Sequence, residues 1–201
     1  MEDTRPYIST ASGARLYLTG DPGYVPLDDM LWGIARECRF SNNVRRDVTH
    51  YSVAEHSWHI GQWAERYARM PAFAETGLSP EKFIRTAYLH DLQEGLLRDV
   101  PSPLKAVLPD YRAIEDRVCR WLADLYNLYY PLPPSIHLAD KALSLIEAER
   151  LCARGMTADW PDEWRDFPLL GNTRLHCWDY RDAYWTLALT WPVNNLLRRG
   201  M

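Results

Sequence analysis

The chain has 201 residues, a hydrophobic content of 47% and a formal net charge of −4, so it is most simply one domain with a proper core. The acidic balance gives no electrostatic reason to bind duplex nucleic acid, and no apolar run is long enough to span a membrane. The four cysteines are too dispersed for a CxxC zinc site and the first residues lack the layout of a signal peptide, which predicts a cytoplasmic protein with reduced thiols.

The chain is expected to begin with an N-terminal extension, residues 1–26, that is rich in turn-forming residues. Within it, Ala14–Leu18 and Tyr24–Val25 are predicted to form a short hairpin around the turn between them. From Leu27 to Cys38, apolar residues recur at three- and four-residue spacing, which is typical of an amphipathic helix. Asp28 is the expected N-cap of this helix.

Two further helices follow a polar loop at Arg39–Tyr51. The first is predicted from Ser52 to about Ala68 and places His56 on its inner stripe, where an unpaired imidazole would cost free energy unless it is bonded or bound to a metal. The second starts at the N-cap Ser79, with Pro80 at its first position, and is predicted to end near Arg98. It carries three chemically active residues along one side: His90, Asp91 and Glu94.

The second half of the chain also has helical periodicity. One amphipathic helix is predicted at Tyr111–Leu128, and Ser135 is the expected cap of a helix that carries Asp140. The segment 155–178 is irregular and rich in Trp, Pro and Asp, and a last helix is predicted at Tyr180–Leu197. We therefore expect an all-α protein whose residues 1–201 form a single domain.

The pattern of His and Asp residues indicates a divalent-metal site. His90 and Asp91 are adjacent on a helix and can grip one ion from two sides of a turn, while Glu94 faces the same space one turn later. His56 and Asp140 lie on separate predicted helices, so the ion would join three helices. Four protein ligands at most leave room for water and a substrate oxygen, which a catalytic ion requires.

The same residues could also have ordinary structural roles without binding a metal. His90 and Asp91 could be a pair on a helix surface, and Asp140 a solvated acid near a helix start. His59, three residues after His56, is interpreted as a packing residue or a partner of a metal ligand, not as a ligand. Glu147 could support the site from the same face as Asp140, but we interpret it as an ordinary helix-face acid.

Three stretches of the sequence together resemble the HD-domain superfamily of metal-dependent phosphohydrolases. They are Tyr51-Ser-Val-Ala-Glu-His-Ser57, Ala87-Tyr-Leu-His-Asp-Leu-Gln-Glu94 and Arg98-Asp-Val-Pro-Ser-Pro-Leu-Lys105. Within the superfamily the chain is similar to the small bacterial and phage branch of 5′-deoxynucleotidases and phage dATP triphosphohydrolases. The resemblance implies a helical bundle with a metal site between its helices.

The resemblance also assigns roles to individual positions. The implied metal ligands are His56, His90, Asp91 and Asp140, and the ion is a divalent Co, Mn, Zn, Fe or Mg. Glu94 matches the catalytic acid that orients the attacking water, and Asp91 serves catalysis through the ion that it holds. The implied substrate contacts are an arginine on the scissile phosphate, an aromatic ring against the sugar, a carboxylate in the nucleotide pocket and a lysine near the phosphates: Arg39, Phe40, Asp99 and Lys105.

Two departures from the family pattern concern the substrate. Phe40 stands where nucleotidases have Trp, and Asn42-Asn43 where relatives often have Asn-Gly. Phe40 could equally be a packing residue, and Lys105 a solvated cation if the substrate is a monophosphate. The tryptophans of the irregular segment and beyond, Trp160, Trp164 and Trp178, are interpreted as an aromatic lid or subunit contact, not as a stacking platform for nucleic acid, because few basic residues lie between them.

Three functions are compatible with these residues. The favoured prediction is a triphosphohydrolase that converts a dNTP, with dATP as the leading substrate, to deoxynucleoside and triphosphate. The alternative is a 5′-deoxynucleotidase that releases orthophosphate from dNMPs, and the second alternative is a non-catalytic nucleotide-binding or sensing protein. The resemblance further implies a homo-oligomer.

Overall fold

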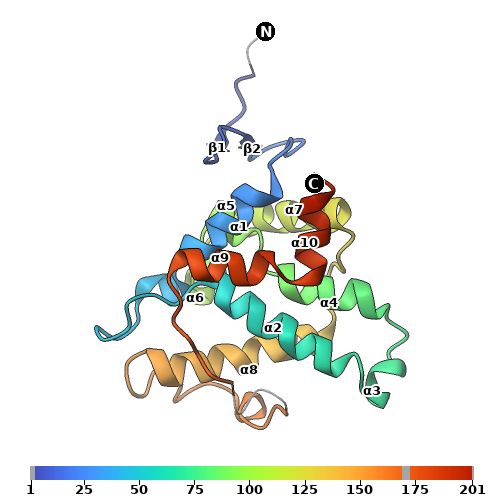
Figure 1. Ribbon diagram of the computed structural model, residues 1–201. Helices are drawn as coiled ribbons and strands as arrows, with labels where there is room; N and C mark the ends of the chain where they lie inside the picture. Colours follow the sequence, from blue (N-terminus) through green and yellow to red (C-terminus); the bar gives the residue numbers. More distant parts are fainter. Residues whose placement is uncertain (1–2, 169–172, 201) are drawn as a thin grey trace.

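A short antiparallel hairpin precedes the helices of the computed structural model, which describes residues 3–168 and 173–200 (Figure 1). Strand β1 (Tyr7–Ser9) pairs with β2 (Arg15–Tyr17), and Ile8 lies opposite Leu16. The predicted pairing of Ala14–Leu18 with Tyr24–Val25 is therefore wrong. The turn that forms is the earlier one, where Gly13 has a φ of 86°, and Val25 is buried in the helical core instead.

Helix α1 (Leu27–Arg36) follows the hairpin and confirms the first predicted helix. Its N-cap position is occupied by Pro26, so the prediction of Asp28 as N-cap is wrong. Asp28 lies in the first turn, where a carboxylate interacts favourably with the helix dipole, and it accepts a hydrogen bond from the Tyr184 hydroxyl.

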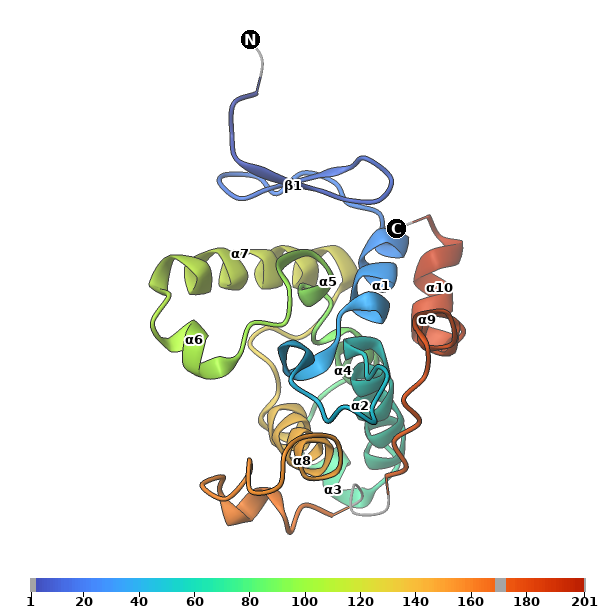
Figure 2. The same ribbon diagram turned by 90° about the vertical axis from the view of Figure 1, so that its left-hand side faces the viewer.

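Helix α2 (Val53–Tyr67) confirms the second predicted helix and runs through the middle of the molecule. Its N-cap is Ser52, whose hydroxyl accepts a hydrogen bond from the Glu55 backbone N–H at 3.0 Å. α2 packs against α1, α4, α8 and α9 (Figure 2). The polar loop before it contains a short 3-10 helix, η1 (Arg39–Asn42).

The third predicted helix begins as expected but breaks at the His-Asp pair. After the short α3 (Pro71–Ala74), helix α4 (Pro80–Leu89) is capped by Ser79. Residues 90–93 form a turn with short-range hydrogen bonds, Leu92 N–H to Leu89 O at 3.2 Å and Glu94 N–H to Asp91 O at 2.9 Å. The chain then re-enters a helix as α5 (Glu94–Leu97), so the prediction of one helix to Arg98 is wrong.

A glycine contact between helices explains where α5 lies. Gly95 of α5 and Gly33 of α1 meet backbone to backbone, and a Cβ atom at either residue would overlap the other helix. The two helices can approach this closely only because neither residue has a side chain. α1 therefore fixes the position of Glu94, the residue that starts α5.

The remaining helices are α6 (Ser102–Ala106), α7 (Pro109–Tyr126), α8 (Pro134–Leu151), α9 (Tyr180–Ala188) and α10 (Trp191–Arg198). Ser135 lies inside α8 after Pro133 and Pro134, so its predicted role as the cap is wrong. The predicted last helix is split in two, because Pro192 stands in the first turn of α10. Proline is tolerated there because a backbone N–H in the first turn has no partner within the helix. The segment 155–178 is irregular in its described part apart from the 3-10 helix η2 (Asp162–Trp164), and its residues 169–172 lie outside the described residues.

The all-α prediction is confirmed, with the small hairpin as an addition. One buried apolar cluster joins α1, α5, α7, α9 and α10 around one side of α2, and a second lies between α2, α4 and α8. The polar side chains of the predicted site lie where α2, α8 and the turn after α4 meet. Among the described residues, we find no helix that is both long and apolar enough to cross a bilayer.

Candidate metal centre

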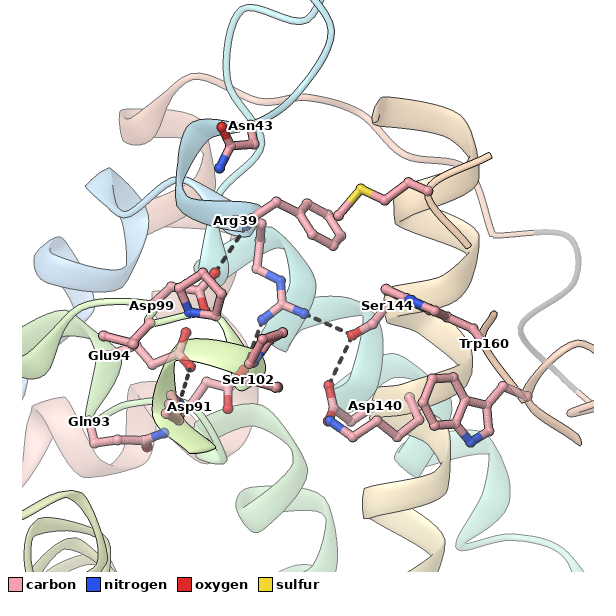
Figure 3. A pocket seen from close by; sticks show the side chains of 18 residues that line it. Arg39, Asn43, Asp91, Gln93, Glu94, Asp99, Ser102, Asp140, Ser144 and Trp160 are labelled. Carbon is pink, nitrogen blue, oxygen red and sulfur yellow. Dashed lines mark hydrogen bonds and ion pairs between the residues drawn. The ribbon is translucent and has the colours of Figure 1, made fainter. Parts of the chain in front are cut away.

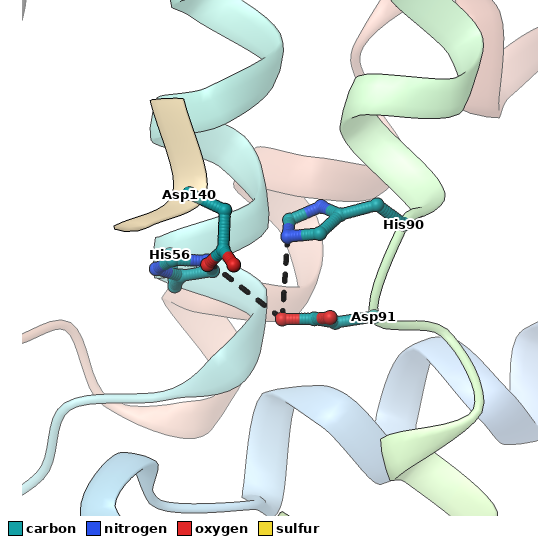
Figure 4. Close-up of side chains that lie close together, drawn as sticks. All are labelled: His56, His90, Asp91 and Asp140. Carbon is teal, nitrogen blue, oxygen red and sulfur yellow. Dashed lines mark ion pairs between the residues drawn. The ribbon is translucent and has the colours of Figure 1, made fainter. Parts of the chain in front are cut away.

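Four predicted ligands converge from three parts of the fold (Figure 4). His56 comes from α2, His90 and Asp91 from the turn after α4, and Asp140 from α8. One ligand atom of each residue lies within 4.8 Å of the others. His56 Nε2 is 3.1 Å from Asp140 Oδ1 and 3.7 Å from Asp91 Oδ2, which is in turn 3.3 Å from His90 Nε2.

The donor set fits a divalent ion. Ligand atoms about 2.0–2.2 Å from one ion lie roughly 3–3.5 Å from their neighbours, close to the separations observed. The Nε2 atoms of His56 and His90 are buried, and within the described part of the chain neither makes a hydrogen bond. Such orphaned nitrogens are costly unless they ligate an ion. Imidazole with carboxylate suits Zn, Mn, Co or Fe.

The second nitrogen of each histidine is fixed by the protein. His90 Nδ1 lies 2.9 Å from the carbonyl oxygen of Ala87, which can only accept, so Nδ1 carries the proton and the lone pair is on Nε2. His56 Nδ1 lies 2.8 Å from Glu147 Oε1, and the Tyr51 hydroxyl donates to the same oxygen at 2.6 Å. Both rings are thereby oriented toward the centre.

Glu147 is a buried part of the centre, so its interpretation as an ordinary helix-face acid is wrong. Although burial alone would raise it, the pKa of Glu147 is lowered by the positive charges of His56 and Arg39. The sequence contained a signal for this role, because Glu147 lies on the apolar stripe of α8, two turns after Asp140. A buried carboxylate costs free energy unless it has a partner, so its position indicated a partner in the site.

Glu94 is placed for acid–base chemistry beside the ligands. It starts α5, is buried, and its Oε2 atom has no hydrogen-bond partner among the described residues. Burial, and then the charges of Asp91 and Asp99, raise the pKa of Glu94 well above its ordinary value. A cation held by the four ligands would lower that pKa again and favour the ionised carboxylate that a general base requires.

Arg39 lies between the predicted ligand Asp91 and the buried carboxylate of Glu147. Its Nη2 donates to Ser144 Oγ at 2.9 Å, its Nη1 is 3.5 Å from Asp91 Oδ2, and its Nε is 3.6 Å from Glu147 Oε2. Ser144 was not singled out in the sequence. The contacts hold a guanidinium at the edge of the centre, where it can meet an anionic substrate.

Phe40 follows Arg39 in an unusual backbone conformation. Phe40, Ser41 and Asn42 have φ values of 58°, 50° and 63°, which non-glycine residues rarely adopt. Asp99 holds this turn, because its Oδ2 accepts from the Phe40 N–H at 3.1 Å and its carbonyl oxygen accepts from Ser41 Oγ at 3.1 Å. Neither buried cluster of the described residues includes Phe40, and its side chain lines a cavity.

Most of the predicted site residues, though not His56 and His90, line one cavity of about 660 Å³ (Figure 3). Its lining contains the four predicted substrate contacts, Glu94, and the two aspartate ligands, Asp91 and Asp140. The lining also includes polar residues that the sequence had not indicated, among them Ser144 and Lys141. Lys105 lies there, but its ammonium is 2.6 Å from Glu115 Oε1 and 3.8 Å from Glu94 Oε1. Glu115, on α7, had no signal in the sequence beyond its charge.

Other residues that had been considered lie elsewhere. His59 is not among the four converging ligands; its Nε2 lies 3.6 Å from Glu55 Oε1 and its ring is parallel to that of His176 at 6.0 Å, which agrees with a packing role. Trp178 packs on Trp58 and His176. Trp160 and Trp164, in contrast, line the cavity.

The helical bundle brings two histidines and two aspartates together beside a cavity that a buried glutamate and an arginine line, which is the arrangement of a metal-dependent hydrolase. Residues 36–147, more than half of the chain, match the family model described as HD domain. The chain belongs to this family and is an HD-family phosphohydrolase.

The chain is also similar to individual bacterial proteins. The chain is 27% identical over 145 residues to the uncharacterized protein YfdR of Escherichia coli K12. The aligned residues cover 72% of this chain and 70% of YfdR. It is 32% identical over 146 residues to an uncharacterized protein of Rhodobacter capsulatus, with coverages of 72% and 70%. It is 29% identical over 119 residues to the 5′-deoxynucleotidase YfbR of Escherichia coli, with coverages of 54% and 60%.

Proposed function

We propose that this protein is a 5′-deoxynucleotidase, which hydrolyses deoxyribonucleoside 5′-monophosphates to deoxynucleoside and orthophosphate. The 5′-deoxynucleotidase was the alternative prediction from the sequence, and we now favour it over the dATP triphosphohydrolase. The names of relatives such as YfbR support it. The observation that carries it is the charge of the cavity.

The charged side chains of the cavity suit a small anion. In the described part of the chain, the lining has four carboxylates (Asp91, Glu94, Asp99 and Asp140) and three cations (Arg39, Lys105 and Lys141). One divalent ion brings this set close to neutrality, and a phosphomonoester adds a charge of about −1.5 to −2. A triphosphate would add more negative charge without a cation left to meet it.

Each of the three cations already has an acidic partner. Lys105 contacts Glu115 and Glu94, and Lys141 Nζ lies 3.2 Å from Asp140 Oδ2. Arg39 faces Asp91 and Glu147. An ammonium that is neutralised in this way has little remaining attraction for β- and γ-phosphates.

The chain's own groups would divide the work of hydrolysis. His56, His90, Asp91 and Asp140 would hold the ion, which when bound supplies a Lewis acid and lowers the pKa of water. The unpartnered Oε2 of Glu94 would accept the proton of the attacking water. Arg39 would stabilise charge that develops on the phosphoryl oxygens.

Phe40 and Asp99 would set the sugar end of the site. The Phe40 ring would crowd the 2′ position of the sugar and so favour deoxyribonucleotides. Asp99 would contribute chiefly by holding the backbone of Phe40, because its carboxylate accepts a hydrogen bond from the Phe40 N–H.

Product analysis tests this proposal directly. The metal-loaded protein is incubated with each dNMP and each dNTP, and the phosphate product is identified by ³¹P NMR. We expect orthophosphate from the dNMPs. Release of intact triphosphate from dATP would establish the triphosphohydrolase instead, and binding of nucleotide without either product would indicate a sensing protein.

A further inference from the structure

The cavity has an apolar wall that the hydrolytic chemistry does not use. Met156, Trp160 and Trp164 line it alongside the charged residues. All three follow α8 and lie outside residues 36–147, the part of the chain that matches the HD domain. In Figure 3, Trp160 lies on the same side of the cavity as Ser144 and Asp140, away from Asp99 and Glu94.

The loop that carries Trp160 is fastened to α8. Thr157 is buried, and its hydroxyl donates to Glu149 Oε1 at 3.4 Å. Arg165 bridges the same elements, because it donates to Glu149 and, at 3.1 Å, to the Thr157 carbonyl oxygen. The Trp160 N–H donates to that carbonyl as well, at 3.1 Å. The backbone of Trp160 is thus held in place before any ligand arrives.

The indole itself is supported from one side. Trp164 packs against Trp160 edge to face, with ring centroids 5.7 Å apart and planes at 74°. Trp160 remains partly exposed, and Met156, which lines the same cavity, is 42% exposed. An aromatic ring that is held by its neighbours and open to a cavity loses little entropy when a flat ligand covers it.

We propose that Trp160 is the stacking platform for the nucleobase of the substrate. The proposal rests on the proposed function, since it takes the phosphate of a deoxyribonucleotide to lie at the metal centre. With the phosphate there, the sugar and base extend from the charged side of the cavity along its wall. Every base has a π face, so stacking on the indole would accept all four bases and bind the larger purines more tightly.

The test compares substrates with and without a base. Hydrolysis of dAMP and dTMP is measured beside that of 1,2-dideoxyribose 5-phosphate, which keeps the sugar ring and phosphate but has no base. We expect Trp160→Ala to raise KM for dAMP by about 5- to 150-fold, the range for losing one base–aromatic stack, and for dTMP by less. KM for the baseless phosphate should stay unchanged.

Two further variants complete the comparison. Trp160→Phe should recover most of the affinity for dAMP, because a benzene ring also stacks. Trp185→Ala removes an indole that is 55% exposed on α9, outside the cavity, and should leave every KM unchanged.

The outcomes separate this proposal from the one it rests on. Equal changes for dAMP and the baseless phosphate in Trp160→Ala, or no change in either, would overturn the stacking role while hydrolysis of dNMPs by the wild type stands. If the wild type hydrolyses no dNMP, the proposed function fails. Equilibrium dialysis of dAMP against wild type and Trp160→Ala then still decides the stacking role, because equal Kd values would exclude it.

Discussion

At the scale of single residues, the centre depends on histidines that have one nitrogen bonded to the protein and one nitrogen free. The Ala87 carbonyl fixes His90, and the Glu147 carboxylate fixes His56. These partners decide which nitrogen faces the ion and keep the ring from turning away. Each histidine ligand would therefore depend on a residue that does not contact the ion itself.

Replacing Glu147 tests this dependence. We expect Glu147→Gln to weaken metal affinity by about 10- to 100-fold, because the neutral amide polarises the His56 ring less and can turn its nitrogen toward it. Metal affinity is measured by competition with a chelator. Glu163→Gln, at an exposed acid of η2, is the control and should bind metal like the wild type. Equal affinities in the two variants would contradict the role of Glu147.

The ligands and the acid–base residue should behave differently on removal. His90→Ala and Asp91→Ala should lose both bound metal and hydrolysis, because an open site has few ligands to spare. Glu94→Ala should keep its metal and lose about 10²- to 10⁴-fold in kcat. Elemental analysis alongside kinetics checks both. Full metal occupancy in the first two variants, or loss of metal in Glu94→Ala, would reverse the assignments.

Phe40 gives a test of sugar selectivity. The wild type should prefer dAMP over AMP, and Phe40→Ala should narrow that preference chiefly by improving kcat/KM for AMP, because it removes the ring that crowds the 2′-hydroxyl. Rates on the two nucleotides are compared under the same conditions. Equal slowing of both would show that Phe40 only supports the turn that Asp99 holds.

At the scale of elements, the break between α4 and α5 decides the geometry of the site. A continuous helix would have carried Glu94 onward along the axis of α4. The turn at residues 90–93 instead redirects the chain so that α5 packs on α1 through Gly95 and Gly33. The pairing of these two glycines therefore sets the distance between the ligands and the acid–base residue.

A methyl group at this contact should separate the two helices. We expect Gly33→Ala to destabilise the protein by about 1–3 kcal/mol, the usual cost of overpacking, and to lower kcat because Glu94 moves with α5. Urea unfolding and kinetics measure the two effects. Asp124→Ala, on the exposed face of α7, is the control and should change the free energy of unfolding by less than about 0.5 kcal/mol. Wild-type stability in Gly33→Ala would show that the helices have room to spare.

At the scale of the whole molecule, an ion held by the four converging residues would join α2, the turn after α4 and α8. Removing it should lower the melting temperature, because an ion that binds only the folded state contributes about 2.7 kcal/mol at 100 times its Kd. For a protein of this size that corresponds to about 5–11 °C. Calorimetry with and without chelator measures the difference. His90→Ala should show no response to metal, and an equal response in this variant would place the stabilising ion elsewhere.

Much of the fold and the site could be predicted from the sequence, because helical periodicity and capping are local signals. They identified α2 and the Ser79 cap of α4, and the ordered His and Asp residues identified the four side chains that converge. The break after Leu89 was missed because the contact that α5 makes beyond it, between Gly95 and α1, is distant in the sequence. The pairing of Lys105 with Glu115 was missed for the same reason, since nothing in either segment indicates the other.

Two predictions about the whole molecule stay predictions. These are the homo-oligomer and the cytoplasmic location. Both depend on properties of surfaces and surroundings that one folded chain does not contain.

The order of the ligands along the chain has a consequence for protein synthesis. A chain leaves the ribosome with its N-terminal part first, so α2 and the turn after α4 emerge well before α8. A nascent chain that has not yet reached Asp140 offers three of the four ligands, and its His56 still lacks Glu147. The four side chains can therefore converge only after α8 has docked, and a chain whose translation stops earlier lacks both Asp140 and Glu147.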